Sequence, residues 1–253
     1  MIDYSPGSLS FLIAAGLAAG LVNAVAGGGS LLVFPALLAV GLPPLQANVT
    51  NSVAQWPGFL GLVLGGREEL EGQRGRIVSL TAVAVAGSLV GCLLLLALPG
   101  AVFDTIVPVL VLLASLLLAA QSQLKRLAGN PGPDAPDRPA LLLPVVFVAS
   151  IYGGYFGGAL GVILISVLAL ATHDRLVRVN ALKGVLSLII TTVTVVVFAI
   201  AAPVDWLAVA VLAPATLVGG FIGARVARRL PEAVLRWSVV TLGIAVAVYL
   251  FVR

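Results

Sequence analysis

The sequence predicts an all-α integral membrane protein built from two inverted repeats of about five transmembrane segments each, with short or broken helices at equivalent positions. Three observations lead to this fold class. Of the 253 residues, 60% are hydrophobic and only 9% are charged, which is too little charge to cover a soluble domain of this size. The apolar residues fall into ten runs separated by glycine, proline or charged residues. The two halves also match one another at a constant offset.

The first half contains five of these apolar runs. The first, 9–26, can cross a bilayer; because no Lys or Arg precedes it, we expect a retained helix and not a cleaved signal peptide. Gly27, Gly28 and Gly29 then interrupt the chain. The second run is short for a hydrocarbon core about 30 Å thick, and Pro43-Pro44 ends it. The second to fifth runs are 30–42, 45–65, 77–98 and 104–123.

A polar stretch rich in Pro, Gly and Asp separates the halves and is expected to be a flexible cytoplasmic linker. It divides the chain into a first membrane repeat (1–124), the linker (125–140) and a second membrane repeat (141–253). The second repeat follows the plan of the first, with a break at Gly157, Gly158 and Gly161. Its five segments are 141–158, 162–172, 179–200, 206–227 and 236–252.

Matched residues of the two halves are always the same number of positions apart in the sequence. We call this separation, which is that between Gly29 and Gly161, the repeat offset. The other residues matched at this offset are Asn48 with Asn180, Gly87 and Gly91 with Gly219 and Gly223, and Leu98-Pro99 with Leu230-Pro231. Duplication explains these gapless matches of Gly, Asn and Pro better than the alternative, which is that two unrelated apolar stretches merely look similar. We interpret the Gly87/Gly219 and Gly91/Gly223 pairs as positions of tight helix packing.

Loop charge predicts that the two repeats are inverted. Loop 66–76 holds three arginines and its equivalent, 198–205, holds none, whereas 99–104 holds none and 225–236 holds four. Positive residues stay in the cytoplasm, so equivalent loops are expected on opposite sides. Five segments per half, with the N-terminus outside, put every basic connecting loop inside. Four per half, with the short runs as re-entrant hairpins, would leave one basic cluster outside.

Candidate site residues gather at the two breaks. Transporters with inverted repeats bind substrate near the midplane, where helices are interrupted, and a helix N-terminus offers N–H groups and partial positive charge to an anion. We expect a substrate site formed by Asn23, Gly27, Gly28, Gly29, Ser30, Asn48, Asn51, Ser52, Gln55 and Trp56 in the first half, and by Tyr155, Gly158, Gly161, Asn180, Lys183 and Ser187 in the second.

Several of these residues have a purely structural alternative. The glycines could serve helix packing alone, Asn48 and Asn180 could be helix N-caps, and Trp56 could belong to the core. Away from the segment ends, Lys183 is the only basic residue within a predicted segment; it could snorkel to the cytoplasmic face or attract an anionic substrate. Because no Asp or Glu lies in the interior of a predicted segment, a carboxylate proton relay is not expected, and a sodium site would have to use backbone carbonyls and neutral oxygens.

Other function classes lack support. The net charge of +4 comes from basic residues scattered through loops, so no nucleic-acid partner is expected. Cys92 is the single cysteine and is interpreted as a small buried residue. His173, the single histidine, lies in a loop beside Asp174, without a catalytic or metal-ligand set facing the membrane interior. We therefore expect neither enzyme activity nor a cofactor.

Three stretches carry a family resemblance: GLVNAVAGGGSLLVFPALLAVGLPPLQANVTNSVA at 20–54, GGYFGGALGVILISVLAL with the following RVNALKG through 184, and GGFIGARVARRLPEAVLR at 219–236. In these the chain resembles the TauE/SafE family, also called the 4-toluene sulfonate uptake permease family. The resemblance implies a bacterial inner-membrane carrier for small anions such as sulfite, sulfoacetate or sulfolactate. Family descriptions often count seven or eight segments, whereas the loop charges predict five per half.

The sequence thus predicts a secondary transporter that moves a small anion, sulfite or an organosulfonate or carboxylate, by alternating access. H+ and Na+ are the candidate coupling ions. Two alternatives stay open: a passive anion channel of similar architecture, and a membrane scaffold without transport activity. The exact substrate, the direction of transport and the oligomeric state are not given by the sequence.

Overall fold

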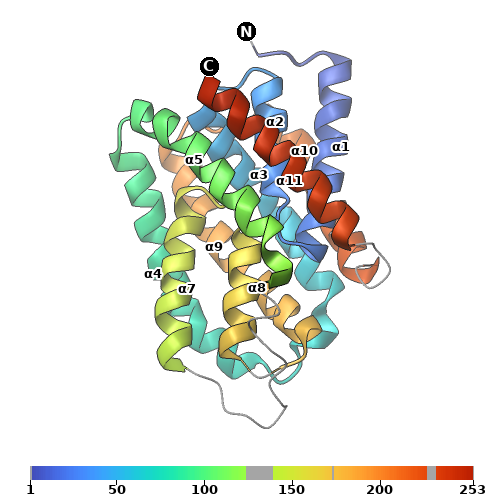
Figure 1. Ribbon diagram of the computed structural model, residues 1–253, viewed down its shortest axis with the longest axis vertical. Coiled ribbons are helices and arrows are strands. Elements are labelled where there is room, and N and C mark those ends of the chain that lie inside the picture. Colours follow the sequence, from blue (N-terminus) through green and yellow to red (C-terminus); the bar gives the residue numbers. More distant parts are fainter. Residues whose placement is uncertain (1, 124–138, 173, 227–231, 253) are drawn as a thin grey trace.

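The computed structural model describes residues 2–123, 139–172, 174–226 and 232–252, and these residues form helices without any strand (Figure 1). The all-α prediction is therefore confirmed. The first half contains α1 (Pro6–Val25), α2 (Ser30–Ala39), α3 (Pro44–Gly65), the 3-10 helix η1 (Arg67–Leu70), α4 (Arg74–Ala97) and α5 (Gly100–Ala119). The second half contains α7 (Pro139–Tyr155), α8 (Leu160–Ala171), α9 (Leu176–Ala201), α10 (Trp206–Val226) and α11 (Glu232–Val252). His173 and nearly all of the predicted linker lie outside the described residues.

The protein is a multi-pass membrane protein. Within the described ranges, six helices are long and apolar enough to cross a bilayer, namely α1, α4, α5, α9, α10 and α11. Large apolar side chains on their outer faces are exposed, as lipid-facing residues are; Leu93, Val109 and Ile200 are examples. α3 has 22 residues, but polar side chains lower its hydropathy. α2 and α8 are short, with 10 and 12 residues, as predicted for the two short runs.

Several helix boundaries differ from the predicted runs by two to four residues, and two of these differences affect the interpretation. α5 begins at Gly100 and not at residue 104, because Pro99 sits at the N-cap and the chain turns directly into the helix, which leaves Asp104 exposed on its surface. α8 begins at Leu160, so Gly161 lies inside its first turn and not ahead of it. The chain breaks there at Gly157, as predicted, and at Ala159; their φ values of +73° and +54° are in the left-handed region.

The glycine interruption after α1 is confirmed. α1 ends at Val25 and α2 begins at Ser30. Gly27 has a φ of +84°, which residues with a Cβ adopt at a cost, and its N–H donates to the Val22 carbonyl over 2.9 Å. The chain then turns back along α1, and Asp3 N–H donates to the Val40 carbonyl over 2.9 Å. α1 and α2 therefore form a helical hairpin in which the start of α1 lies beside the end of α2.

Helix starts in the second half follow those in the first at the repeat offset. α9, α10 and α11 begin at Leu176, Trp206 and Glu232, which are the positions equivalent to the starts of α3, α4 and α5. The left-handed residues Gly27 and Ala159 are related by the same offset. The duplicated spacing in the sequence is thus matched by duplicated local structure.

The halves interlock through their fourth helices. α10 packs against α1 and α3, and α4 packs against α7 and α9, while α3 packs on α9 and α5 on α11. Gly87 and Gly91 let α4 lie directly against the α7 backbone, where a Cβ would clash. Gly219 and Gly223 do the same for α10 on α1. The interpretation of these four glycines as packing positions is therefore confirmed.

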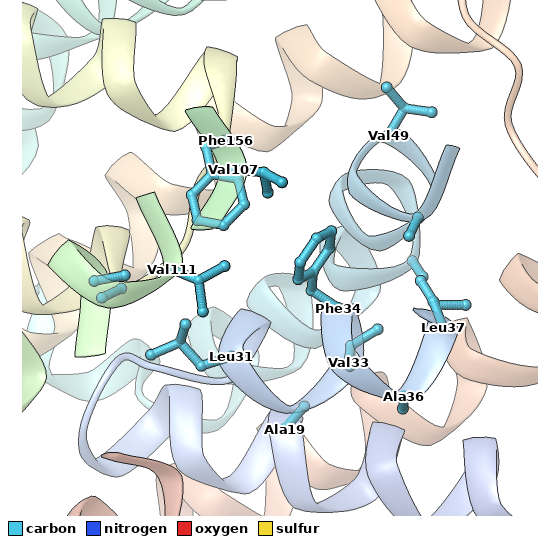
Figure 2. Close-up of a cluster of buried hydrophobic side chains, with 14 of the residues drawn as sticks. Ala19, Leu31, Val33, Phe34, Ala36, Leu37, Val49, Val107, Val111 and Phe156 are labelled. Atoms are coloured by element: carbon cyan, nitrogen blue, oxygen red, sulfur yellow. The ribbon is translucent and has the colours of Figure 1, made fainter. Parts of the chain in front are cut away.

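The short helix α2 is buried in apolar side chains. Figure 2 shows Leu31, Val33, Phe34 and Leu37 of this helix among residues from other helices, with Val107 and Val111 of α5 on one side. The Phe34 ring meets that of Phe156 edge-on, with centroids 5.7 Å apart. Because Phe156 follows α7, this contact joins the two broken regions.

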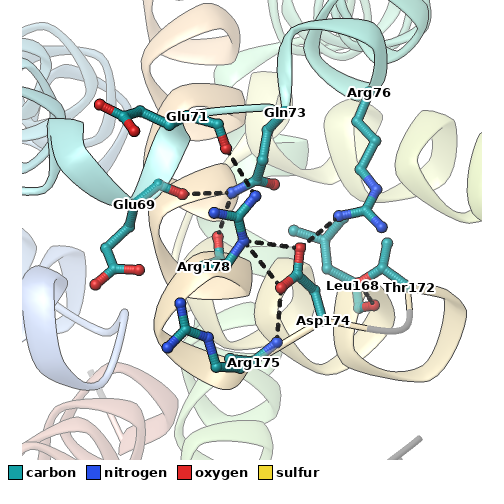
Figure 3. Close-up of polar contacts among 9 residues, drawn as sticks. All are labelled: Glu69, Glu71, Gln73, Arg76, Leu168, Thr172, Asp174, Arg175 and Arg178. Atoms are coloured by element: carbon teal, nitrogen blue, oxygen red, sulfur yellow. Dashed lines mark hydrogen bonds and ion pairs between the residues drawn. The ribbon is translucent and has the colours of Figure 1, made fainter. Parts of the chain in front are cut away.

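At the opposite end from the chain termini, a polar network joins the two halves (Figures 1 and 3). Asp174 accepts from Arg76 Nη1 over 2.8 Å and pairs with Arg178 Nε at 2.9 Å. Arg178 Nη2 also donates to the Glu71 carbonyl over 2.8 Å, and Gln73 Nε2 donates to the Arg178 carbonyl over 3.1 Å. The α3–α4 and α8–α9 connections therefore lie together.

Candidate functional site

Two buried polar stripes occupy equivalent positions on α3 and α9. Asn48, Asn51 and Gln55 are spaced so that they share one face of α3. Asn180, Lys183 and Ser187 repeat that spacing on α9, each at the repeat offset from its counterpart. Five of the six are buried and Asn180 is half-buried. Because α3 packs on α9 and the helix breaks lie beside them, the stripes bring the predicted site residues of both halves into one region.

Asn23 ties the first break to the α3 stripe. Its Oδ1 accepts from Gly29 N–H over 2.8 Å, and its Nδ2 donates to Gln55 Oε1 over 2.9 Å. Gln55 Nε2 in turn donates to Asn51 Oδ1 over 3.3 Å. The amide network thus uses one of the N–H groups exposed by the break and fixes the entry to α2.

Lys183 does not snorkel. Its side chain is fully buried at 0% exposure, and Nζ donates to the Asn23 carbonyl over 2.9 Å. The snorkelling alternative is wrong because the ammonium is held at the C-terminal end of α1, where helix carbonyls carry partial negative charge. Among the buried side chains that the structure describes, Lys183 is the only charged one. The interior of the site is therefore electropositive.

Asn48 and Asn180 each reach the end of a helix in the other half. Asn180 Nδ2 donates to the Ala24 carbonyl over 3.1 Å, and Asn48 Nδ2 donates to the Tyr155 carbonyl over 3.0 Å. The N-cap alternative is wrong for both, because α3 and α9 begin several residues earlier. Ser52 does not join this exchange, since its hydroxyl donates to the carbonyl of Asn48 within α3.

The two breaks touch each other through glycine. A Cβ at Gly27 would lie 2.8 Å from the Gly161 Cα, so the backbones are in direct contact. Gly28 lies against Leu118, and the Gly158 carbonyl accepts from Tyr152 Oη over 2.6 Å. These glycines therefore serve close packing and also interrupt the helices. Ser30, half-buried, begins α2.

Four buried polar atoms at the stripes and the second break have no hydrogen-bond partner among the described residues. They are Asn48 Oδ1, Tyr155 Oη, Asn180 Oδ1 and Ser187 Oγ. Buried polar atoms are ordinarily paired, so a group of orphans is a sign of a ligand site. Three of the four belong to the second half.

Two further buried or half-buried side chains, Trp56 and Gln121, make contacts near the predicted site residues. Half-buried Trp56 donates from Nε1 to Thr192 Oγ1 over 2.8 Å, so it bridges α3 and α9. Sequence reasoning missed Gln121, which is fully buried and donates from Nε2 to the Ala26 carbonyl over 3.1 Å. The available signal was a group of polar residues, Gln121 to Gln123, at the end of an apolar run. Within the described chain, no three His, Cys, Asp or Glu residues cluster as metal ligands would.

Comparisons with known proteins identify the family of the chain. A family model described as "Sulfite exporter TauE/SafE" matches residues 12–250. "Probable membrane transporter protein YfcA" of Escherichia coli strain K12 is 28% identical over 236 residues, or 89% of this chain and 81% of that protein. A "Probable membrane transporter protein" of Haemophilus influenzae is 26% identical over 92% of this chain and 90% of its own length. "Probable membrane transporter protein ORF9" of Sinorhizobium sp is 29% identical, but the match spans 58% of it. No solved structure matches the chain.

Proposed function

Because the chain belongs to the TauE/SafE family of membrane transporters, we propose that it is a secondary transporter that moves a small anion, sulfite or an organosulfonate or carboxylate, by alternating access. The observation that carries the proposal is the pair of equivalent stripes on α3 and α9, whose one buried charge is positive. A buried ammonium attracts an anion, and the amides and hydroxyls around it supply hydrogen bonds. Orphaned hydroxyls at Tyr155 and Ser187 are donors suited to anion oxygens.

We also propose that the two repeats are inverted about the plane of the membrane. The helix starts that recur at the repeat offset support the duplication. The exchange of packing, in which α4 lies on α7 and α10 on α1, supports a two-fold relation between the halves. Basic residues in the α3–α4 and α8–α9 connections, which lie together, support placing that end in the cytoplasm and the N-terminus outside a bacterial inner membrane.

A carrier fits the centre of the molecule better than a passive channel. Gly27 and Gly161 are in backbone contact where the two breaks meet, and Phe34 packs on Phe156 beside them. This contact closes the straight route between the breaks. Passage of a solute then requires the halves to move relative to one another, as in alternating access.

Flux into proteoliposomes tests the proposal. Purified protein is supplied with sulfite, sulfonates, sulfate and short carboxylates, and saturable flux with counterflow is expected for at least one of them. Lys183→Met is expected to lower that flux more than tenfold, because the positive charge is removed from the site. Thr194→Val, a buried α9 position whose hydroxyl bonds only within its own helix, is the matched control. Conductance without counterflow would instead identify a channel.

A further inference from the structure

The C-terminal end of α1 is held by a cation. Lys183 Nζ donates to the Asn23 carbonyl over 2.9 Å, and Asn180 Nδ2 donates to the Ala24 carbonyl over 3.1 Å. A helix C-terminus carries about half a negative charge on its free carbonyls. The tethered ammonium therefore neutralises a buried helix end.

At the equivalent end of α7, no charged side chain among the described residues is tethered in this way. Tyr155 is equivalent to Asn23 at the repeat offset, and its carbonyl accepts from Asn48 Nδ2, which corresponds to Asn180. The position that corresponds to Lys183 is Asn51, a neutral residue whose Oδ1 accepts from Gln55. The two halves thus share one architecture but differ by one positive charge.

Asn48 leaves an acceptor unfilled beside this helix end. The residue is 0% exposed, and its Oδ1 has no partner in the described part of the chain. The amide orientation is fixed, because exchanging Oδ1 and Nδ2 would set an oxygen against the Tyr155 carbonyl. An amide oxygen cannot donate, so only a hydrogen-bond donor or a cation can satisfy it.

We propose that the C-terminal end of α7 is a monovalent cation site for Na+, with Asn48 Oδ1 and the Tyr155 carbonyl among its oxygen ligands. Neutral oxygens and a helix C-terminus suit Na+ in transporters with broken helices. Divalent cations ordinarily bind carboxylates, and the buried side chains that the structure describes include no Asp or Glu. The bound Na+ is the counterpart of the Lys183 ammonium. Its role as coupling ion rests on the proposed transporter function, whereas its binding does not.

Thermal unfolding of the purified full-length protein in detergent tests the site without any transport assay. Replacing choline chloride by NaCl at equal ionic strength is expected to raise the Tm by about 2–4 °C, since a ligand that binds only the folded state stabilises it. Asn48→Ala should abolish the shift. Asn180→Ala, the equivalent change in the other half, should keep it. An equal wild-type Tm in the two salts, or a full shift in Asn48→Ala, would overturn the site.

Asn51→Lys provides a second test that does not depend on the folding of Asn48→Ala. This change places a tethered ammonium at the position equivalent to Lys183 and is expected to remove the Na+ dependence of Tm while keeping the protein folded. A shift in Asn51→Lys as large as in wild type contradicts the proposal. If neither the anion flux nor the Tm depends on Na+, the Na+ site is wrong and the transporter function is retained. A Na+-dependent Tm without flux of any anion would do the reverse.

Discussion

The hydroxyl of Ser187 behaves unlike other buried serine hydroxyls in this protein. Those of Ser88, Ser115, Ser150 and Ser166 each donate to the carbonyl four residues earlier in their own helix. The Ser187 hydroxyl is equally buried but has no partner within the described residues. Its donor is therefore unused among the described residues, which fits the proposed role of binding an anion.

Ser187→Ala is expected to separate stability from transport. Removing an unsatisfied buried hydroxyl should leave the free energy of unfolding unchanged or raise it by up to about 1 kcal/mol. Anion flux should fall several-fold, because a donor to the substrate is lost. Ser166→Ala is the matched control, since it removes only a bond within its own helix, and flux should not change. Urea unfolding and proteoliposome flux measure the two effects; normal flux in Ser187→Ala would exclude this hydroxyl from the site.

The residue types of the stripes were predictable, but their partners were not. Polar residues one turn apart in an apolar run indicate a functional face, which singles out Asn51, Gln55 and Lys183. The bonds from Asn48 to Tyr155 and from Asn180 to Ala24 join residues 107 and 156 positions apart. Such pairs depend on how whole helices pack, and no local pattern encodes them. The burial of the Lys183 ammonium was unpredictable for the same reason.

At the scale of helices, glycine sets how closely neighbours approach. A Cβ at Gly91 would lie 2.9 Å from Tyr155 N and would also clash with the Ile151 carbonyl oxygen, so α4 and α7 would have to separate. Gly75, at the exposed start of α4, has nothing within 4 Å of its ideal Cβ. In α4, close packing therefore requires glycine at position 91 but not at position 75.

Gly91→Ala is expected to cost about 2–3 kcal/mol of unfolding free energy, because an overpacked interface must shift. Gly75→Ala should be neutral or stabilising by about 0.5–1 kcal/mol, since alanine favours the helix. The midpoint of thermal unfolding for the two variants measures the difference. Equal midpoints would mean that α4 and α7 are not in the close contact seen here.

The Asp174 network links two loops and gives stability a defined dependence on pH. Burial acts to raise the pKa of Asp174, but hydrogen bonds from Arg178, Arg76 and the Arg175 N–H outweigh it, and the pKa lies below its ordinary value. The folded state therefore binds this proton less readily than the unfolded state does. Its stabilisation is fully present above the unfolded pKa of about 3.9 and is lost as pH falls through the folded pKa.

Asp174→Asn is accordingly expected to lower stability by about 1 kcal/mol at neutral pH. The difference from wild type should shrink below about pH 4, where the wild-type carboxylate becomes protonated. Thermal unfolding of both proteins at neutral and acid pH provides the comparison. Asp104→Asn is the control, because Asp104 is exposed on α5. A stability difference between wild type and Asp174→Asn that stays constant with pH would mean that the carboxylate charge does not stabilise the contact between the two loops.

Element positions followed from the sequence better than the number of crossings did. The ten apolar runs correspond to ten helices in the described ranges, because glycine and proline mark the ends of apolar segments. Only six of those helices qualify as spans by length and composition. α3 is excluded because the polar residues of its stripe lower its mean hydropathy. Hydropathy therefore does not identify this helix as a span, although it is long enough to be one.

At the scale of the whole molecule, contacts group the connections at two ends. The Asp205 N–H donates to Thr50 Oγ1 over 3.0 Å, and Asp3 N–H meets the Val40 carbonyl, at the end where both termini lie (Figure 1). Arg76 and Asp174 meet at the other end. The start of α3 and the start of α9, which are equivalent in the repeat, thus lie at opposite ends of the molecule. This arrangement is the one expected if the two repeats are inverted, as proposed above.

Ala101 and Ala233 provide a matched pair for testing that inversion. They are related by the repeat offset, both are exposed alanines, and each lies in the first turn of its helix, α5 or α11. In a Cys92→Ala background, which removes the buried native thiol, Ala101→Cys is expected to react with an impermeant maleimide in intact cells. Ala233→Cys should react only after permeabilisation, because basic residues flank it in the sequence and such residues favour the cytoplasmic side. Reaction of both from one side would mean parallel repeats, in which the α3 and α9 stripes could not be related by a two-fold axis in the membrane plane. The reverse labelling pattern would keep the inversion and turn the whole molecule over.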